Sequence, residues 1–215
     1  MNEDAMVCVV DDDEPVRTAL VRLLKSAGYQ ACGYPSGQAL LAEPLPTGGV
    51  PTVVLTDLRM PGLDGIALAE RLASSPMPPP IVFLTAHGDV PATVRAMRDG
   101  AVDFLEKPVQ EENLFEALGR AIARSREQIQ RQEGLRDLQV KYGKLTPRER
   151  QVFALVVSGL INKEVAWELG VCEKTIKVHR ARVVEKMEAH SLPDLVRMAE
   201  RLGVPSETPS RASTG

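Results

Sequence analysis

The sequence is poor in cysteine and in aromatic residues. It has three cysteines among 215 residues, Cys8, Cys32 and Cys172. They share no motif spacing, and their odd number argues against a disulfide framework, so a reducing compartment is expected. Aromatic residues make up 4% of the chain. That is too few to suggest an aromatic-lined cavity, so the sequence argues against a regulator that senses a small molecule.

Long hydrophobic runs and an export signal are also missing. No apolar run approaches the ~18 residues that a membrane span requires. The first six residues are acidic and lack the basic segment and apolar stretch of a signal peptide. The sequence therefore predicts a soluble protein of the cytoplasm.

The net charge of −3 hides an uneven distribution. Residues 1–122 carry 9 basic against 17 acidic side chains, whereas residues 123–144 carry 6 against 3 and residues 145–215 carry 11 against 9. An acidic front and a basic rear suggest that the front binds cations and that the rear faces an anionic partner.

Residues 6–122 alternate short apolar runs with amphipathic segments. The expected strands are 6–10, 29–34, 52–56, 81–84 and 102–105, and the expected helices lie near 16–27, 36–42, 64–73, 90–99 and from 111 onward. Five such strand–helix units predict an α/β domain in which helices cover both faces of a parallel sheet.

Polar residues follow four of these strands directly. Asp11 and Asp12 follow the first strand, Asp57 the third, Thr85 the fourth and Lys107 the fifth. Ligands of open parallel sheets bind beyond the carboxyl ends of the strands, so these side chains should converge. A single acidic residue at the end of a loop is usually a helix cap. Five polar residues that all follow strands of one fold are hard to attribute to capping.

The converging set predicts a site for a divalent cation and a phosphoryl group. Asp12 and Asp57 could bind Mg²⁺ directly, with Asp11 acting directly or through water. The Asp57 carboxylate could also attack phosphorus and form an aspartyl phosphate. Lys107 would then neutralise the developing charge, and Thr85 would donate a hydrogen bond to the phosphate.

Beyond residue 122 the pattern is helical. Residues 123–144 are expected to be a helical linker, which is either solvated or paired with a second copy as a short coiled coil. Residues 145–204 predict four helices that include a helix-turn-helix, and the Ser-, Thr- and Pro-rich residues 205–215 predict a disordered tail.

One of these helices is expected to open at Thr175 and to end near Met187, within the strongly basic segment 173–187. Ile176, Val183 and Met187 share one face, which we expect to pack on the preceding helices together with Trp167 and Leu169. The opposite face predicts contact with DNA through Lys174, Lys177, Val178, Ala181 and Arg182. His179 is also predicted to contact DNA. Lys177 would read guanine and the small apolar groups thymine methyls, whereas Arg182, Thr175 and Lys163 would bind phosphates.

Nearly all of residues 6–122 resembles the two-component receiver domains. The resemblance is carried by Val10-Asp11-Asp12-Asp13, Thr56-Asp57-Leu58-Arg59-Met60-Pro61-Gly62, Leu84-Thr85-Ala86 and Glu106-Lys107-Pro108. It implies a flavodoxin-like (βα)5 fold with sheet order 2-1-3-4-5. It also implies that Asp57 accepts phosphate from a sensor histidine kinase, and that Asp11, Asp12, Asp57 and the backbone carbonyl of Arg59 bind Mg²⁺ or Mn²⁺. The Lys107–Pro108 bond is expected to be cis.

The same resemblance implies a conformational switch. Thr85 should move toward the phosphate and vacate space that Phe104 can fill. The alternative is that Phe104 is an ordinary core residue. Arg59 and His87 stand two positions after Asp57 and Thr85, and we expect them to set the lifetime of the phosphate.

Residues 145–202 resemble the LuxR-type helix-turn-helix. The matching segments are Leu145-Thr146-Pro147-Arg148-Glu149, Asn162-Lys163-Glu164-Val165-Ala166, Thr175-Ile176-Lys177-Val178-His179 and Ser191-Leu192. Together with Gly88-Asp89-Val90-Pro91, the order of the two regions resembles FixJ-like response regulators. Ala181 departs from the pattern, because relatives often have a polar residue there. The resemblance implies a dimer contact through the last helix, at Leu195, Val196 and Ala199, and the alternative is that these residues close the core of the small domain.

The sequence as a whole predicts a transcriptional regulator whose binding to double-stranded DNA is switched by phosphorylation, with dimerisation on phosphorylation or DNA binding. Its expected parts are a receiver at 1–122, a linker at 123–144, a DNA-binding domain at 145–204 and the tail. Two alternatives remain: a constitutive DNA-binding regulator with a vestigial receiver, and a Mg²⁺-dependent phosphohydrolase with an aspartyl intermediate. The phosphohydrolase would need a second catalytic carboxylate beside Asp57, where the sequence has Arg59, so we expect no enzyme.

Overall fold

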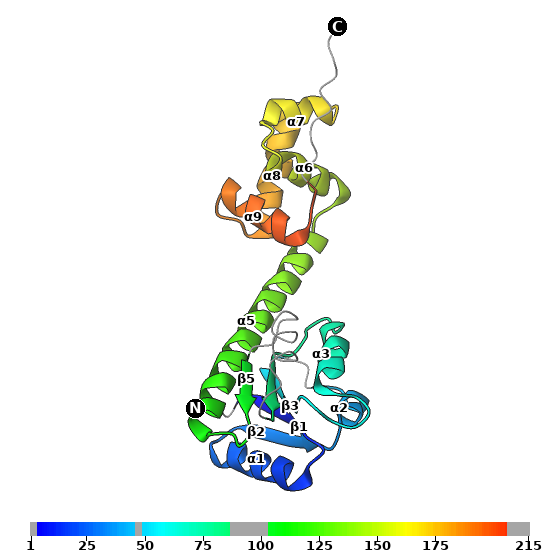
Figure 1. Ribbon diagram of the computed structural model, residues 1–215. Coiled ribbons are helices and arrows are strands. Elements are labelled where there is room, and N and C mark those ends of the chain that lie inside the picture. Colours follow the sequence, from blue (N-terminus) through cyan, green and yellow to red (C-terminus); the bar gives the residue numbers. More distant parts are fainter. Residues whose placement is uncertain (1–3, 46–48, 87–102, 206–215) are drawn as a thin grey trace. The chain divides into compact units, whose positions relative to one another are not determined.

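The computed structural model describes residues 4–45, 49–86 and 103–205. Its N-terminal part contains one parallel sheet (Figure 1), whose strands are β1 (Met6–Val10), β2 (Gln30–Tyr34), β3 (Thr52–Asp57), β4 (Ile81–Thr85) and β5 (Asp103–Glu106). The strand order is β2-β1-β3-β4-β5. The predicted α/β class and sheet order are therefore confirmed.

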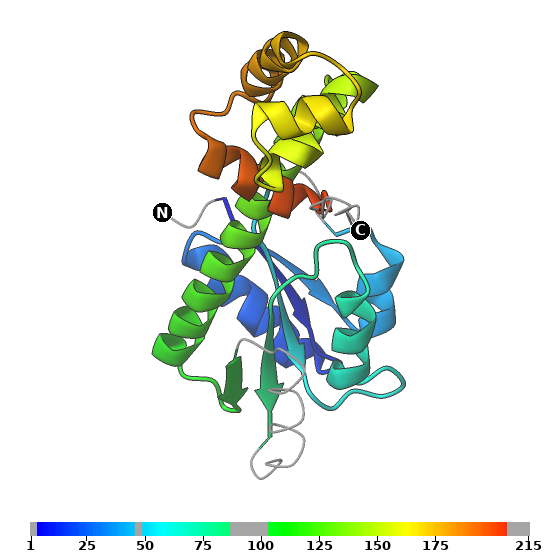
Figure 2. The same ribbon diagram turned by 90° about the horizontal axis from the view of Figure 1, so that it is seen from above.

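Helices α1 (Glu14–Ser26) and α5 (Glu111–Gly143) lie on one side of the sheet, and α2 (Gly37–Ala42) and α3 (Gly65–Ala73) lie on the other (Figure 2). Alternate strand residues point to opposite faces, so each strand contributes to two cores. Val7, Val9, Val53 and Leu55 pack with α1 and α5. The residues between them pack with α2 and α3 in the second core, which includes Cys8, Val10, Val54, Leu40, Leu68 and Leu72.

Helix α5 is 33 residues long. The chain divides into two compact units, 1–130 and 131–215, and α5 contributes to both. In the first unit, the buried Ser125 hydroxyl accepts a hydrogen bond of 3.1 Å from the backbone N–H of Thr52, the first residue of β3. Residues 123–143 are thus helical, as predicted for a linker, and continue the helix that begins at Glu111.

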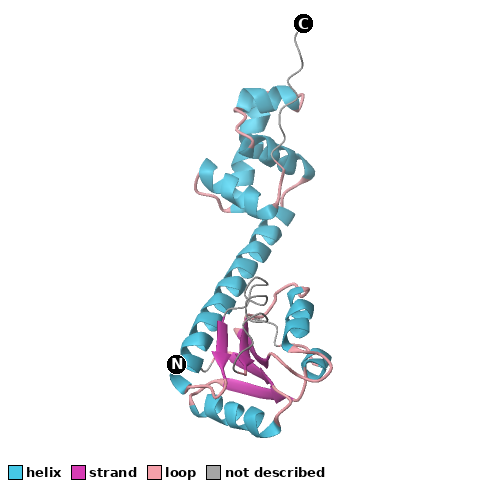
Figure 3. Cartoon of the chain, in the orientation of Figure 1, coloured by secondary structure: helices cyan, strands magenta, loops and turns pink. Residues whose placement is uncertain are grey.

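The second unit is helical (Figure 3) and contains α6 (Pro147–Val157), α7 (Asn162–Glu168), α8 (Glu173–Met187) and α9 (Leu192–Leu202). A capping box starts α6: the Thr146 hydroxyl accepts from the N–H of Glu149, and the Glu149 carboxylate accepts from the N–H of Thr146. The end of α5 packs into the core of this unit, where Leu138 and Leu145 meet Phe153, Val183 and Met187.

One packing prediction is wrong. Ile176, Val183 and Met187 are buried as expected, but the side chain of Trp167 is 74% exposed. Helix α7 has only seven residues and buries Val165 and Ala166. The next position, Trp167, is turned by about 100° toward solvent. Helix α8 also begins two residues before the predicted Thr175.

Among the residues that the structure describes, none of the helices is both long enough and apolar enough to span a membrane.

Candidate functional site

The carboxyl ends of β1 and β3 bring three acids together. These strands are parallel neighbours in register, with Val10 opposite Thr56, so the residues that follow them lie side by side. The carboxylates of Asp11, Asp12 and Asp57 offer oxygen atoms that all lie within 4.8 Å of one another. Asp11 is fully buried and Asp12 is exposed, whereas the Asp57 side chain is 16% exposed. The predicted convergence of these acids is therefore observed.

Lys107, which follows β5, reaches into the same cluster. Its Nζ lies 2.7 Å from Asp11 Oδ2 and 2.5 Å from Asp57 Oδ2. Partial burial lowers the pKa of Lys107, but the hydrogen bonds to Asp11 and Asp57 outweigh it, and the net pKa is raised. The ammonium group therefore stays charged between two carboxylates. The Lys107–Pro108 bond is cis, as expected.

The loop after β3 approaches Asp57 closely. Asp57 Oδ1 accepts a hydrogen bond of 3.0 Å from the backbone N–H of Arg59. Helix α3 begins at Gly65, whose N–H donates to the Leu58 carbonyl at 3.0 Å. A Cβ at Gly65 would collide with the backbone carbonyl of Asp57. This position therefore requires glycine, because the start of α3 lies directly against the backbone of the acid.

A residue that the sequence did not predict also belongs to this site. Arg17, on the first turns of α1, donates from Nη1 to the backbone carbonyl of Asp11 at 2.6 Å. The signal in the sequence was a basic residue one turn into the helix that follows the three aspartates. Its role depends on a contact with the backbone, which side-chain patterns do not reveal.

The predicted switch residues lie at the adjoining strand ends. Thr85 is half-buried, and its hydroxyl donates to the Ala86 carbonyl at 3.0 Å. Phe104 stacks on Phe83 with ring centroids 5.0 Å apart. Both residues therefore have partners within the sheet region. His87 and residues 88–91 lie outside the described residues.

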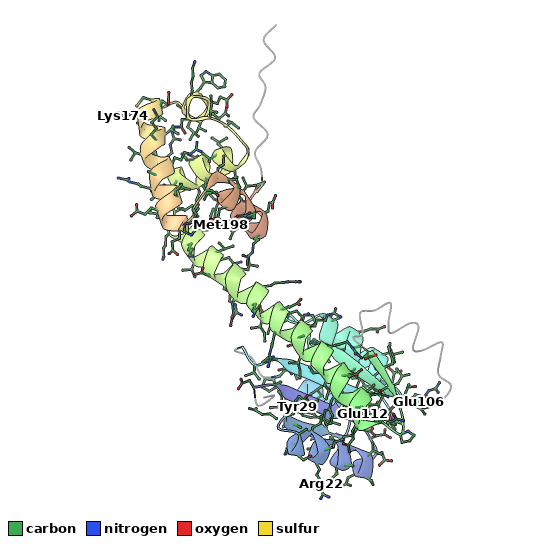
Figure 4. The ribbon with its side chains drawn as sticks, turned by 90° about the vertical axis from the view of Figure 1, so that its left-hand side faces the viewer. Arg22, Tyr29, Glu106, Glu112, Lys174 and Met198 are labelled. Atoms are coloured by element: carbon green, nitrogen blue, oxygen red, sulfur yellow. The ribbon has the colours of Figure 1, made fainter. Side chains whose placement is uncertain are left out.

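On α8, the exposed face holds most of the predicted DNA contacts: Lys174, Lys177, Val178, Ala181 and Arg182. Lys174 lies at the outer end of the helix (Figure 4). Lys177 pairs with Glu173 at 3.2 Å. Lys163 on α7 is also exposed, whereas Thr175 and His179 are half-buried. These positions leave a basic surface interrupted by small apolar groups.

Other contacts hold α8 in place. Arg180 Nη1 donates to the Asn162 side chain at 3.0 Å, which joins α8 to the start of α7. Lys186 Nζ lies 2.6 Å from Glu149 Oε2 on α6. Neither contact could be predicted from the sequence, because Arg180 and Lys186 have the pattern of solvent-exposed charges. The two contacts join α8 to α7 and to α6.

The predicted dimer contacts need correction. Leu195 and Ala199 are 1% and 3% exposed and pack in the core of the second unit. Val196 is half-buried. A side chain that is enclosed in its own unit cannot contact a second copy, so the alternative holds for Leu195 and Ala199: they close the small core.

Comparison with known families agrees with both halves of the chain. Residues 7–119 match the response regulator receiver domain, and residues 143–199 match the bacterial regulatory proteins of the luxR family. The chain belongs to the two-component response regulators. Its receiver domain contains the acidic cluster with Lys107, and its LuxR-type domain contains α8. This identification confirms the family predicted from the sequence motifs.

Individual proteins resemble this response regulator over almost its whole length. Nodulation protein W of Bradyrhizobium diazoefficiens is 42% identical over 200 residues, which are 93% of this chain and 87% of the relative. Transcriptional regulatory protein FixJ of the same species is 42% identical, covering 95% and 98%. The solved structure of response regulator StyR has a TM-score of 0.78 at 42% identity, covering 92% of this chain and 99% of the other.

Proposed function

We propose that this response regulator accepts a phosphoryl group on Asp57 from a sensor histidine kinase, and that the modification controls DNA binding by α8. The observation that carries the proposal is the cluster of Asp11, Asp12, Asp57 and Lys107. Asp57 is the partly exposed acid in contact with Lys107, so it can meet a donor that arrives from solvent.

The chain's own residues account for the transfer. An Asp57 oxygen attacks phosphorus, and the bond from phosphorus to the kinase imidazole nitrogen breaks, with the nitrogen keeping the electron pair. Lys107 already contacts the accepting carboxylate and stays protonated, so it can neutralise charge on the phosphoryl oxygens. The Thr85 hydroxyl would exchange the Ala86 carbonyl for a phosphate oxygen as its acceptor.

The acidic cluster fits a divalent cation. Three carboxylates within 4.8 Å form the hard-oxygen donor set that Mg²⁺ and Mn²⁺ prefer. Asp11, Asp12, Asp57 and the backbone carbonyl of Arg59 would hold it. When bound, the cation would neutralise charge on the transferring phosphoryl group. Lys107 supplies one positive charge against three carboxylates, so the cluster retains negative charge for a cation.

The switch would start at Thr85. Movement of Thr85 toward a phosphate on Asp57 would leave space into which the Phe104 ring, now stacked on Phe83, could move. This shift would alter the surface at β5. Arg59 and His87 remain predicted to tune the lifetime of the phosphate. Because Arg59 stands where a hydrolase would need a second carboxylate, we propose slow, stoichiometric chemistry rather than an enzyme with turnover.

The DNA-binding half of the proposal rests on the exposed face of α8. Lys177 and Lys174 can reach base edges with Val178 and Ala181 beside them, as recognition helices do in the major groove. Arg182, Thr175 and Lys163 would bind phosphates, and His179 lies along the same helix. Two copies would bind two half-sites as a dimer, with Val196 left as the predicted contact on α9. Because the DNA of a bacterium lies in its cytoplasm, we propose that the protein acts there. We also propose that the receiver ends at residue 122, the linker at 144 and the DNA-binding domain at 204.

The test compares wild-type protein with Asp57→Asn, incubated with acetyl phosphate and Mg²⁺. Asp4→Asn is the matched control, because Asp4 is an exposed aspartate just before the amino end of β1, whereas the site lies beyond the carboxyl ends of the strands. Intact-protein mass spectrometry should find an adduct of about 80 Da, one phosphoryl group, in wild type and in Asp4→Asn but not in Asp57→Asn. Phosphorylated wild type should also form a dimer and bind selected DNA duplexes more tightly.

Two results would contradict the proposal. An adduct in Asp57→Asn would place the acceptor elsewhere. DNA affinity that responds neither to acetyl phosphate nor to Asp57→Asn would identify a constitutive DNA-binding protein with a vestigial receiver.

A further inference from the structure

We infer that Arg17 is a positioning residue for the cation site: it fixes the peptide between Asp11 and Asp12 so that both carboxylates face the cation together. The inference rests on the proposed function, because it concerns the Mg²⁺ that would support phosphorylation of Asp57. Nothing in the receiver motifs themselves assigns this role to Arg17.

The first step is the contact between Arg17 and the backbone. Arg17 Nη1 lies 2.6 Å from the carbonyl oxygen of Asp11, which belongs to the peptide that joins Asp11 to Asp12. A charged donor on a carbonyl is a strong hydrogen bond. It restrains rotation of that peptide plane and therefore the direction in which the Asp12 side chain leaves the backbone.

The second step is the difference between the two acids. Asp11 is held at several points: its N–H donates to the Tyr34 carbonyl at 3.2 Å, and its carboxylate accepts from the Asp13 N–H at 2.9 Å and from Lys107. Asp12 is exposed, and it reaches the cluster through the peptide that Arg17 holds. The orientation of Asp12 therefore depends more on Arg17 than that of Asp11 does.

The third step is the space made for Arg17. A Cβ added to Gly33, on β2, would lie 3.1 Å from Arg17 Cγ, 3.3 Å from Arg17 Cδ and 3.3 Å from Val21 Cγ2. These distances are tighter than ordinary van der Waals contacts, so the missing side chain at Gly33 leaves room for the arginine stem. Gly33→Ala should consequently shift the Arg17 stem, together with Val21, by a few tenths of an ångström without altering any charge.

The charge of Arg17 and its positioning role predict opposite results. The positive charge of arginine beside the acids repels a divalent cation and so disfavours its binding. If charge were its main effect, replacing Arg17 with a neutral residue would tighten cation binding. If positioning dominates, the same replacement weakens binding, so the sign of the change separates the two explanations.

The experiment uses the full chain and measures Mn²⁺ binding from the loss of the free-ion EPR signal, with Mg²⁺ affinity obtained by competition. Arg17→Met keeps an unbranched apolar stem but removes the charge and the donors, and Arg17→Lys keeps the charge and one donor group. The matched control is Arg22→Met, because Arg22 is exposed on the outer side of the same helix (Figure 4). Urea unfolding establishes conditions in which every variant is folded.

We expect Arg17→Met to weaken cation binding about tenfold, as loss of a supporting contact behind a metal ligand does. Arg17→Lys should recover part of the affinity, Gly33→Ala should weaken binding, and Arg22→Met should leave it unchanged. Equal or tighter binding by Arg17→Met would overturn the inference. If Arg17→Met does not fold, Gly33→Ala decides in its place, and unchanged affinity there overturns the inference as well.

The outcome is separable from that of the proposed function. Normal binding and phosphorylation in wild type, together with unchanged affinity in the variants, would remove Arg17 from the site and leave the function standing. A wild-type protein that binds neither cation would overturn both.

Discussion

The ion pair between Glu149 and Lys186 should stabilise the DNA-binding unit in a pH-dependent way. Glu149 is 1% exposed, and its Oε2 accepts from Lys186 Nζ at 2.6 Å and from the Thr146 N–H at 2.8 Å. The hydrogen bond from Lys186 lowers the pKa of Glu149 against the opposing effect of burial, and Thr146 adds to it, giving a value of about 2. Replacement by glutamine keeps the cap on Thr146 but removes the charge.

The expected cost of Glu149→Gln at pH 7 is about 2–3 kcal/mol, the range for a hydrogen bond between charged groups that leaves one partner poorly satisfied. Lys186 retains a contact with the Lys144 carbonyl at 3.1 Å, which keeps the loss below that of an isolated buried charge. Because the folded pKa is depressed, the stabilisation is complete above pH 4.5 and is lost as the pH falls toward 2. The difference in unfolding free energy between wild type and Glu149→Gln should therefore become smaller at low pH.

Urea unfolding at a series of pH values, followed by far-UV circular dichroism, measures this difference. Hydrogen exchange of the α6 and α8 amides assigns the loss to the second unit. Glu185→Gln, an exposed acid on the same helix as Lys186, is the control and should change stability by less than about 0.5 kcal/mol. A Glu149→Gln variant as stable as this control, or a difference that stays constant down to pH 2, would refute the reasoning.

Two further predictions concern α8. Lys177→Ala should cost about 1–3 kcal/mol of DNA-binding free energy and relax the sequence preference at one base pair, whereas Arg182→Ala should weaken binding to all duplexes alike and lower the slope of log affinity against log salt concentration by about one. Fluorescence anisotropy at several salt concentrations checks both variants. Uniform weakening by Lys177→Ala would contradict the assignment of Lys177 to a base contact. Glu188 has φ 55 at the end of α8, so Glu188→Gly should raise stability by about 0.5 kcal/mol despite losing the Lys141 ion pair. Glu188→Gln, which keeps the strained backbone, should show no such gain in urea unfolding.

The acidic site could be predicted because its residues follow directly from the strands. An apolar run that ends in Asp57 places that acid at the carboxyl edge of the sheet, and the parallel order brings Asp11 and Asp12 to the same edge. The distance constraint comes from regular backbone geometry, so no knowledge of side-chain packing was needed. The position of Lys107 at this edge followed in the same way from the end of β5.

The errors came from helices, where a pattern shows which residues share a face but not what covers that face. Trp167 was expected in the core because it is large and apolar, yet α7 is too short to bury it. Leu195 and Ala199 form an apolar stripe that suits either a second copy or the unit's own core. The choice depends on α5, α6 and the turn between them, which supply Leu138, Phe153 and Leu145 to the same cluster.

The sequence alone determined the two-part plan of the protein, the parallel sheet and the acids at its edge, because strand and helix periodicity and residue order are local properties of the chain. Only the tertiary structure decided the partners: Lys107 between Asp11 and Asp57, Arg17 on the Asp11 carbonyl, and Glu149 with Lys186. Each of these contacts joins different elements, and the last links residues 37 positions apart. Such pairs depend on how the elements pack, which local patterns do not encode.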